Sequence, residues 1–276
     1  MAQDLSNFIS EVWSQKLTAL LDKSGVMMQC VNRNYEGEIK NSGDTVHIRT
    51  FGDVNVKDYA GSISYDDLTS PMQTMTIGQK KYFAFKVDDI TKAQTNIDIM
   101  SGYLERAKVS IDLAKDTYCL SKVADAHADN IISTSVITKD NFYTNMVGIA
   151  KLLKKANATS KGQKPWVIIN PDLEALLIQA PEFIQANQTG DKTLKEGSIG
   201  RIAGLDVLVC TNFVDVSGTF NVMAGTNDAI TFASQVTEVE KIRLQNSFDT
   251  AVRGLYVYDA KVIQPKALVK AVFTLS

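Results

Sequence analysis

The chain has 276 residues, of which 45% are hydrophobic and 22% are charged, and this composition is ordinary for a folded protein with a sizeable core. Its formal net charge of −2 argues against a strongly basic nucleic-acid binder. Three cysteines, Cys30, Cys119 and Cys210, lie far apart without metal-ligand spacing, which favours a reducing compartment. We find no signal peptide and no apolar stretch of transmembrane length, and we therefore expect no membrane partner.

The first predicted element is an amphipathic helix over residues 5–21, whose apolar side chains recur at intervals of three and four. Two interpretations stay open. The helix lies on the core of its own chain, or it is an N-terminal arm that packs on a neighbouring subunit. In the second interpretation we expect Phe8, Val12 and Trp13 to be subunit contacts.

Residues 34–88 are expected to form an extended arm that is rich in turn residues. A turn at 41–44 precedes a strand at 45–50, in which alternation places Val46 and Ile48 on one face.

The arm is expected to return through strands at 75–77 and 82–85, separated by residues 78–81. Few side chains between 36 and 72 are large and apolar. We therefore expect this segment to need a partner that covers it, or else to be mobile.

A single long helix is predicted over residues 91–130, which contain no proline and only Gly102. Such a helix would be about 60 Å long at ~1.5 Å per residue. A rod beside a poorly cored hairpin suits a subunit that grips several neighbours, so assembly is the first hypothesis. A coiled coil is the alternative, but Ser121 and Asp125 interrupt the seam, and a helix lying across a sheet is favoured. The apolar seam comprises Ile97, Met100, Leu104, Ala107, Ile111, Ala114 and Tyr118.

The remainder of the chain has an α/β pattern. Thr138 is predicted to cap a helix, and Asn170-Pro171 to begin another. Residues 185–197 are expected to form a mobile loop. The first helix carries the apolar residues Phe142, Met146, Ile149 and Leu153. Strands are predicted at 166–169, 205–209, 220–223, 229–232, 235–244, 256–258, 261–263 and 267–275.

The sequence shows no catalytic, cofactor or metal constellation. We expect His47 and His127 to lie on solvated faces. The stretch 189–193 superficially resembles a phosphate loop, but it lacks the leading glycine and carries Asp191 where an acid opposes phosphate binding. The one tight basic cluster, 151–155, is expected to be a solvated helix face.

The order of these parts resembles the major capsid proteins of tailed bacteriophages, which have the Hong Kong phage-type capsid fold shared with herpesviruses and encapsulin shells. The resemblance covers nearly the whole chain, and its motifs are structural. The stretches that carry it are Val31-Asn32-Arg33-Asn34-Tyr35-Glu36-Gly37, Gly43-Asp44-Thr45-Val46, residues 82–90, residues 199–207 and Arg253-Gly254-Leu255-Tyr256-Val257-Tyr258.

This resemblance implies an α+β capsid fold with an N-terminal arm, an extended β-hairpin loop, a long spine helix and an α/β axial domain. The implied divisions are an arm at 1–33, an extended loop at 34–88, a peripheral domain at 89–132, an axial domain at 133–252 and a returning peripheral β segment at 253–276. Asp58 and Tyr59 of the loop join the expected subunit contacts.

The same resemblance implies a structural protein that is not an enzyme and needs no cofactor. It implies assembly through hexamers and pentamers into an icosahedral shell around double-stranded DNA, which is held by confinement. The expected partners are copies of the chain, a separate scaffolding protein, a portal and other capsid proteins. The expected location is the virion, with assembly in the host cytoplasm. An encapsulin-like shell around protein cargo and a small-molecule enzyme on the α/β half remain the alternatives.

Overall fold

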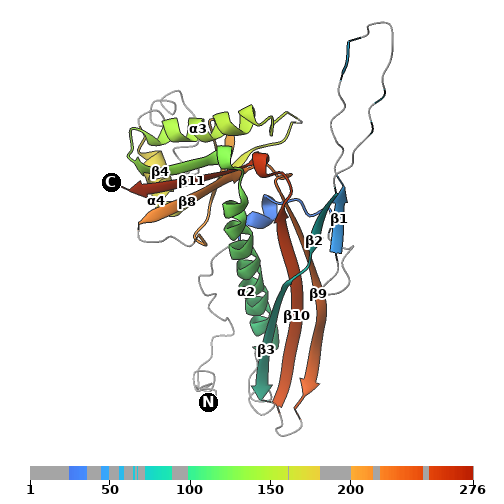
Figure 1. The fold of residues 1–276 in the computed structure, drawn as a ribbon. Coiled ribbons are helices and arrows are strands. Elements are labelled where there is room, and N and C mark those ends of the chain that lie inside the picture. Colours follow the sequence, from blue (N-terminus) through green and yellow to red (C-terminus); the bar gives the residue numbers. More distant parts are fainter. Residues whose placement is uncertain are drawn as a thin grey trace.

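A computed structural model describes residues 25–35, 45–49, 56–58, 65, 67, 72–88, 99–160, 162–180, 200–213, 218–244 and 249–275. The predicted N-terminal helix, the loop at 185–197 and the stretch 189–193 lie outside these residues. Within them the fold is α+β, with a six-stranded sheet, a three-stranded sheet, a two-stranded hairpin and a long helix that runs between the layers (Figure 1).

The three-stranded antiparallel sheet has the order β3-β10-β9 and is built from long strands. Its members are β3 (Gln79–Asp88), β9 (Ile230–Arg243) and β10 (Asp249–Val262). The four short strands predicted at 229–232, 235–244, 256–258 and 261–263 are therefore two long strands. They were predicted as separate because the sequence alternation breaks, whereas β9 and β10 continue through a register shift at Leu255/Tyr256. The predicted connection at 78–81 between the two returning strands is also shorter than expected, since β3 already begins at Gln79.

The spine helix is α2 (Ile99–Ser121), and it lies along the three-stranded sheet, as predicted (Figure 1). The predicted end near residue 130 is wrong. After Ser121 the chain continues in the 3-10 helices η3 (Lys122–Asp125) and η4 (Ala128–Asn130). His127 is extended between them and its side chain accepts from the Asp129 amide, so the residue caps a turn and does not lie on a helical face.

The hairpin pairs β1 (Thr45–Arg49) with β2 (Met72–Thr76). As alternation predicts, Val46 and Ile48 are buried on one face. The expectation that this segment lacks a core is wrong at its base, because β9 and β10 residues and the stretch after the hairpin cover that face. The resulting cluster contains Val46, Ile48, Met75, Ile77, Ala233, Val257 and Ile263.

The six-stranded sheet is mixed and has the order β4-β11-β8-β5-β7-β6. Strand β11, within the segment 253–276, pairs parallel with β4 and antiparallel with β8. The strands are β4 (Ile131–Ile137), β5 (Trp166–Ile169), β6 (Arg201–Ile202), β7 (Leu205–Val209), β8 (Thr219–Gly225) and β11 (Leu268–Leu275).

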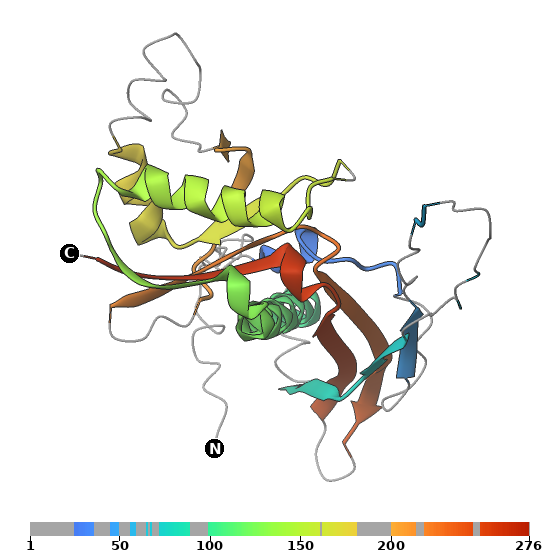
Figure 2. The same cartoon turned by 45° about the horizontal axis from the view of Figure 1, so that its top comes forward.

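Two helices cover one face of this sheet: α3 (Phe142–Lys155) and α4 (Pro171–Ile178) (Figure 2). The four apolar residues predicted for α3 are all buried. The predicted cap at Thr138 is wrong, because Asn141 is the N-cap residue of α3. Asn170 caps α4 as expected, since its side chain accepts a 3.1 Å hydrogen bond from the Leu173 amide.

Strand β5 divides the interior into two cores, because successive side chains point to opposite faces. Val167 and Ile169 enter the cluster beneath α3 and α4. Trp166 and Ile168 enter a second cluster on the other face, together with side chains of α2 and β10. The six-stranded sheet and the spine therefore share one apolar core.

Candidate assembly surfaces and the junction that holds them

A buried carboxylate connects three distant segments of the chain. Asp116 lies in α2 and is fully buried. Its Oδ1 accepts hydrogen bonds from the amides of Val26 (2.6 Å) and Met27 (2.7 Å), at the start of the 3-10 helix η2 (Met27–Gln29). Its Oδ2 accepts from Asn212 Nδ2 at 2.8 Å and from Cys210 Sγ at 3.5 Å. One side chain thus fixes the entry of the N-terminal segment and the loop after β7 onto the spine.

Three buried free thiols surround this carboxylate: Cys30, Cys119 and Cys210. Burial raises the pKa of the Cys30 thiol to about 12, and the negative charge of Asp116 and the nearby Cys210 add to the rise. Burial, followed by the charge of Asp116, also raises the pKa of Cys119. A thiol held in the protonated form is a poor nucleophile and a poor metal ligand, so Cys30 and Cys119 are core residues.

A second carboxylate, Asp259 of β10, joins the sheet to the spine. Tyr118 Oη donates to Asp259 Oδ1 at 2.8 Å, and the Gly78 amide donates to Oδ2 at 2.9 Å. Burial raises the pKa of Tyr118, and its hydrogen bond to the carboxylate raises it further. The Tyr118 ring also meets Tyr258 edge-on at 5.5 Å between ring centroids. The link between β2 and β3 is thereby held against α2.

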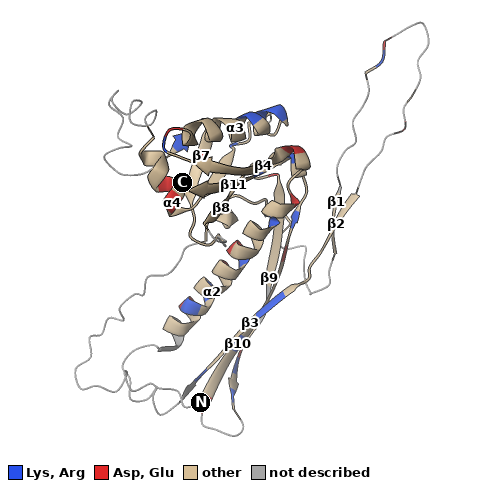
Figure 3. Cartoon of the chain, turned by 60° about the vertical axis from the view of Figure 1, so that its left-hand side comes forward, with Lys and Arg blue, Asp and Glu red and all other residues tan. Residues whose placement is uncertain are grey.

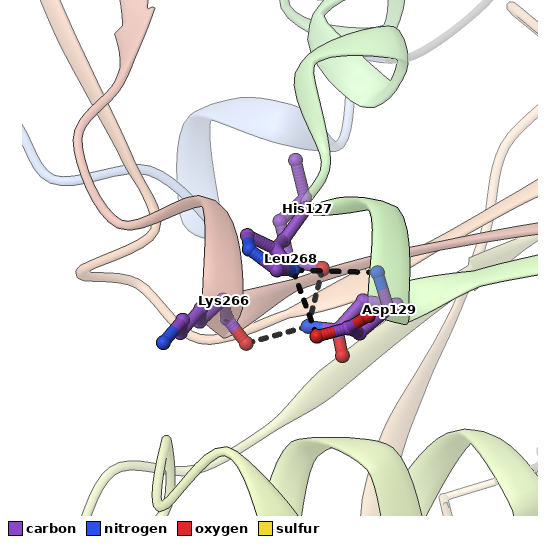
Figure 4. A network of polar contacts seen from close by, with 5 residues as sticks. His127, Asp129, Lys266 and Leu268 are labelled. Atoms are coloured by element: carbon purple, nitrogen blue, oxygen red, sulfur yellow. Dashed lines mark hydrogen bonds and ion pairs between the residues drawn. The ribbon is translucent and has the colours of Figure 1, made fainter.

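A third junction lies where the spine ends. Asn130 Nδ2 donates to the carbonyls of Lys266 (2.7 Å) and Leu268 (3.1 Å), and His127 packs beside it with Asp129 (Figure 4). The His127 amide donates to the Pro265 carbonyl at 3.1 Å, in the 3-10 helix η5 (Pro265–Ala267). These bonds fix the step from α2 into the six-stranded sheet.

The three-stranded sheet uses only part of its surface internally. On the helix side the Phe83 ring lies over Gly254, and Phe85 meets Tyr103 of α2 at 5.7 Å. On the opposite side Tyr82, 80% exposed, lies directly across from Leu255, 38% exposed. This exposed apolar pair has charged neighbours on the same face, among them the Arg253–Glu240 ion pair, and an apolar centre with a charged rim is the character of a contact surface.

The predicted contact residues fall mostly outside what the structure describes. Phe8, Val12, Trp13 and Tyr59 are all in that group. Asp58 is described and exposed. Nearby, Val56 is 99% exposed and Tyr65 is 91% exposed. The exposure of Val56 and Tyr65 could not be predicted from the sequence, because polar residues surround both of them in a pattern that a partly buried strand also shows.

The described residues contain no group of three or more His, Cys, Asp or Glu side chains that could hold a metal ion. None of the helices in those same residues is long and apolar enough to cross a membrane. Asp116 could not be recognised from the sequence, because an acid within an amphipathic helix is ordinarily assigned to the solvent side. Only its partners, about ninety residues away on either side, reveal its role.

The profile of the phage capsid protein family matches residues 73–271. A chain from Mycobacterium phage Che8 is similar at 27% identity and a TM-score of 0.80, with 98% of each chain covered. A chain in the capsid of the cyanophage P-SCSP1u shares the fold at 12% identity and a TM-score of 0.76, covering 100% of this chain and 96% of that one. The capsid of Ralstonia phage GP4 does so at 10% identity and a TM-score of 0.75, with 97% and 96% covered.

A search of curated proteins finds no match. The family match spans most of the chain, and the order of the elements is that of the tailed-phage capsid fold. The chain therefore belongs to the phage capsid protein family and is a structural major capsid protein that builds an icosahedral shell.

Proposed function

We propose that this protein assembles through hexamers and pentamers, and that the shell encloses double-stranded DNA. The observation that carries the proposal is the uncovered face of the three-stranded sheet at Tyr82 and Leu255. A monomer gains nothing from exposing adjacent apolar side chains, whereas a subunit buries them against its neighbours.

In this proposal the chain divides by role. Residues 1–33 are the N-terminal arm, and 34–88 are the extended loop that lies over an adjacent subunit. Residues 89–132 and 253–276 form the peripheral domain, and 133–252 form the axial domain at the capsomer centre. The sheets cross these boundaries, because β3, β9 and β10 come from three of the ranges and β11 pairs with β4 and β8 of the axial range.

We assign the predicted contacts to these roles. Phe8, Val12 and Trp13 act from the arm, and Asp58 and Tyr59 act from the loop. The full exposure of Val56 and the near-full exposure of Tyr65 support contacts in the loop, because apolar side chains at such positions are stabilised only by a partner.

Scaffolding protein, portal and other capsid proteins act as separate partners, and assembly takes place in the host cytoplasm. The chain works without enzymatic activity or cofactor. DNA is held by confinement, since a net charge of −2 offers few phosphate contacts.

Electron microscopy of the purified protein, with and without scaffolding protein, tests the assembly. We expect closed shells with five-fold and six-fold capsomers. Sedimentation that shows only monomer or dimer across concentration, salt and added scaffold contradicts the proposal. Nuclease-protected DNA extracted from particles supports the DNA content, and protected protein cargo without DNA argues for a cargo-enclosing shell.

A further inference from the structure

The outer face of α3 carries a groove. Its volume is about 460 Å³, and its walls come from one face of α3 and from the turn between β6 and β7. Ala203, which lines the groove from that turn, is a non-glycine residue with a φ of 51°, in the left-handed region. The groove is lined by Tyr143, Val147, Ala150, Lys151, Lys154, Lys155 and Ala203.

The groove combines an apolar floor with uncompensated positive charge. Val147 is 43% exposed on its floor. Lys151, Lys154 and Lys155 are exposed, and none of them forms an ion pair with another described residue. Like charges three and four residues apart on a helix repel each other. The predicted solvated helix face is confirmed, since the three lysines are exposed, and the same face borders a groove whose positive charge a negatively charged partner would neutralise.

The opposite end of the same layer has the complementary charge. Strand β5 runs back from the end of α3, so α4 begins at the far end of the sheet (Figure 1). The first turn of α4 carries Asp172 and Glu174, and neither forms an ion pair with a described residue. Figure 3 shows basic residues at the C-terminal end of α3 and acidic residues at α4, at opposite ends of the domain.

We propose that the basic groove on α3 binds the acidic first turn of α4 from a second copy of the chain, and that this contact closes the capsomer ring. The inference rests on the proposed assembly through hexamers and pentamers. Two different, complementary patches at opposite ends of a subunit make a head-to-tail contact, which generates a ring when the rotation closes. Opposite charges at such a contact set the partner and the register.

Nucleic acid is the competing occupant of the groove. A phosphate backbone would satisfy the three lysines, but it would leave Val147 and Ala150 against a charged strand. An α4 turn brings both acidic groups and apolar side chains, and the same chain supplies it in equal number to the groove. These two features favour a second copy.

Charge reversal tests the contact. We expect Lys154→Glu/Lys155→Glu and Asp172→Lys/Glu174→Lys each to lower the assembled fraction at least about tenfold. Combining all four changes in one chain restores the complementarity, and shells should return. Lys108→Glu/Asp125→Lys, at exposed positions outside the groove, is the matched control and should assemble normally. Circular dichroism and thermal unfolding establish whether each variant folds. If Asp172→Lys/Glu174→Lys does not fold, Asp172→Asn/Glu174→Gln replaces it as the variant that removes the charge of the α4 turn.

Mixing Lys154→Glu/Lys155→Glu with Asp172→Lys/Glu174→Lys gives a sharper outcome; these two are the single-sided variants, each reversed on one side of the contact only. Every groove then faces an α4 turn of opposite charge only when the two chains alternate around the ring. We therefore expect even-membered rings and no five-fold vertices. Normal assembly of either single-sided variant, or failure of the four-change chain to recover, overturns the contact while shells of the unaltered chain uphold the proposed function. DNA binding that is lost in Lys154→Glu/Lys155→Glu, with assembly intact, assigns the groove to nucleic acid instead.

Discussion

Asn212 Nδ2 donates a 2.8 Å hydrogen bond to Asp116 Oδ2, and this bond spans 96 positions of the sequence. It brings the loop after β7 onto the spine helix at the level where Val26 and Met27 bind the other carboxylate oxygen. The placement of the six-stranded sheet and of the N-terminal segment therefore depends on the same charged group.

Replacing Asp116 with asparagine should lower the free energy of unfolding of the unassembled subunit by about 2–3 kcal/mol. The amide offers one acceptor oxygen in place of two and sets a buried donor against existing donors. Denaturant titration measures the change. Asp112→Asn on the same helix is the control, because it loses only an ion pair to Lys115 at a position 42% exposed, and it should cost less than about 1 kcal/mol. Equal stability of the Asp116 variant and the unaltered chain would contradict the junction.

Gly254→Ala should destabilise the subunit by about 1–3 kcal/mol, because the new methyl group would lie within 2.5 Å of the Phe83 ring. Phe83→Leu in the same chain should recover part of the loss, and a double-mutant cycle measures the coupling. Gly148→Ala in α3 is the matched control. It meets nothing within 4 Å, and a helix-interior alanine should stabilise by about 0.5–1 kcal/mol. If the effects of Phe83→Leu and Gly254→Ala on the free energy of unfolding simply add, the Phe83 ring and Gly254 are not coupled.

We expect the free energy of unfolding of the subunit to fall at high pH because of the buried Cys30 thiol. Burial raises its pKa from 9.0 to about 12, so the folded state holds the proton more tightly than the unfolded chain. This contribution is fully present below pH 9 and is lost as the pH rises towards 12, by at most about 1.4 kcal/mol per pH unit. Urea unfolding at a series of pH values should show the decline. Cys30→Ala should make it shallower, and an unchanged slope would mean that this thiol is not the group involved.

Ala107→Pro should abolish soluble subunit and not only assembly. Proline in the interior of α2 removes a backbone hydrogen bond and clashes with the preceding turn, at a cost of about 3 kcal/mol or more. Ala107→Gly, which weakens the helix by about 1 kcal/mol without a clash, is the control and should leave folded protein. A folded, unassembled Ala107→Pro monomer, seen by circular dichroism and gel filtration, would show that the spine is dispensable to the fold.

Local signals predicted the elements in which burial and sequence pattern agree. Strand β5 and the start of α4 are examples, since a continuous apolar run precedes an Asn-Pro cap. The helix end was misplaced, because residues 122–130 contain neither glycine nor proline and only tertiary contacts of His127 and Asn130 turn the chain. The junction at Asp116 could not be predicted, as its four partners come from segments with no shared pattern.

The alternation along β5 has a mechanical consequence. Trp166 and Ile168 face the spine, whereas Val167 and Ile169 face α3 and α4, so one four-residue strand is clamped from both sides. The layer that carries the groove cannot pivot on the spine without separating closely packed apolar side chains. A load applied at one contact between subunits is therefore transmitted through the subunit as through a rigid body. Any change in shell curvature must be absorbed at the contacts between subunits.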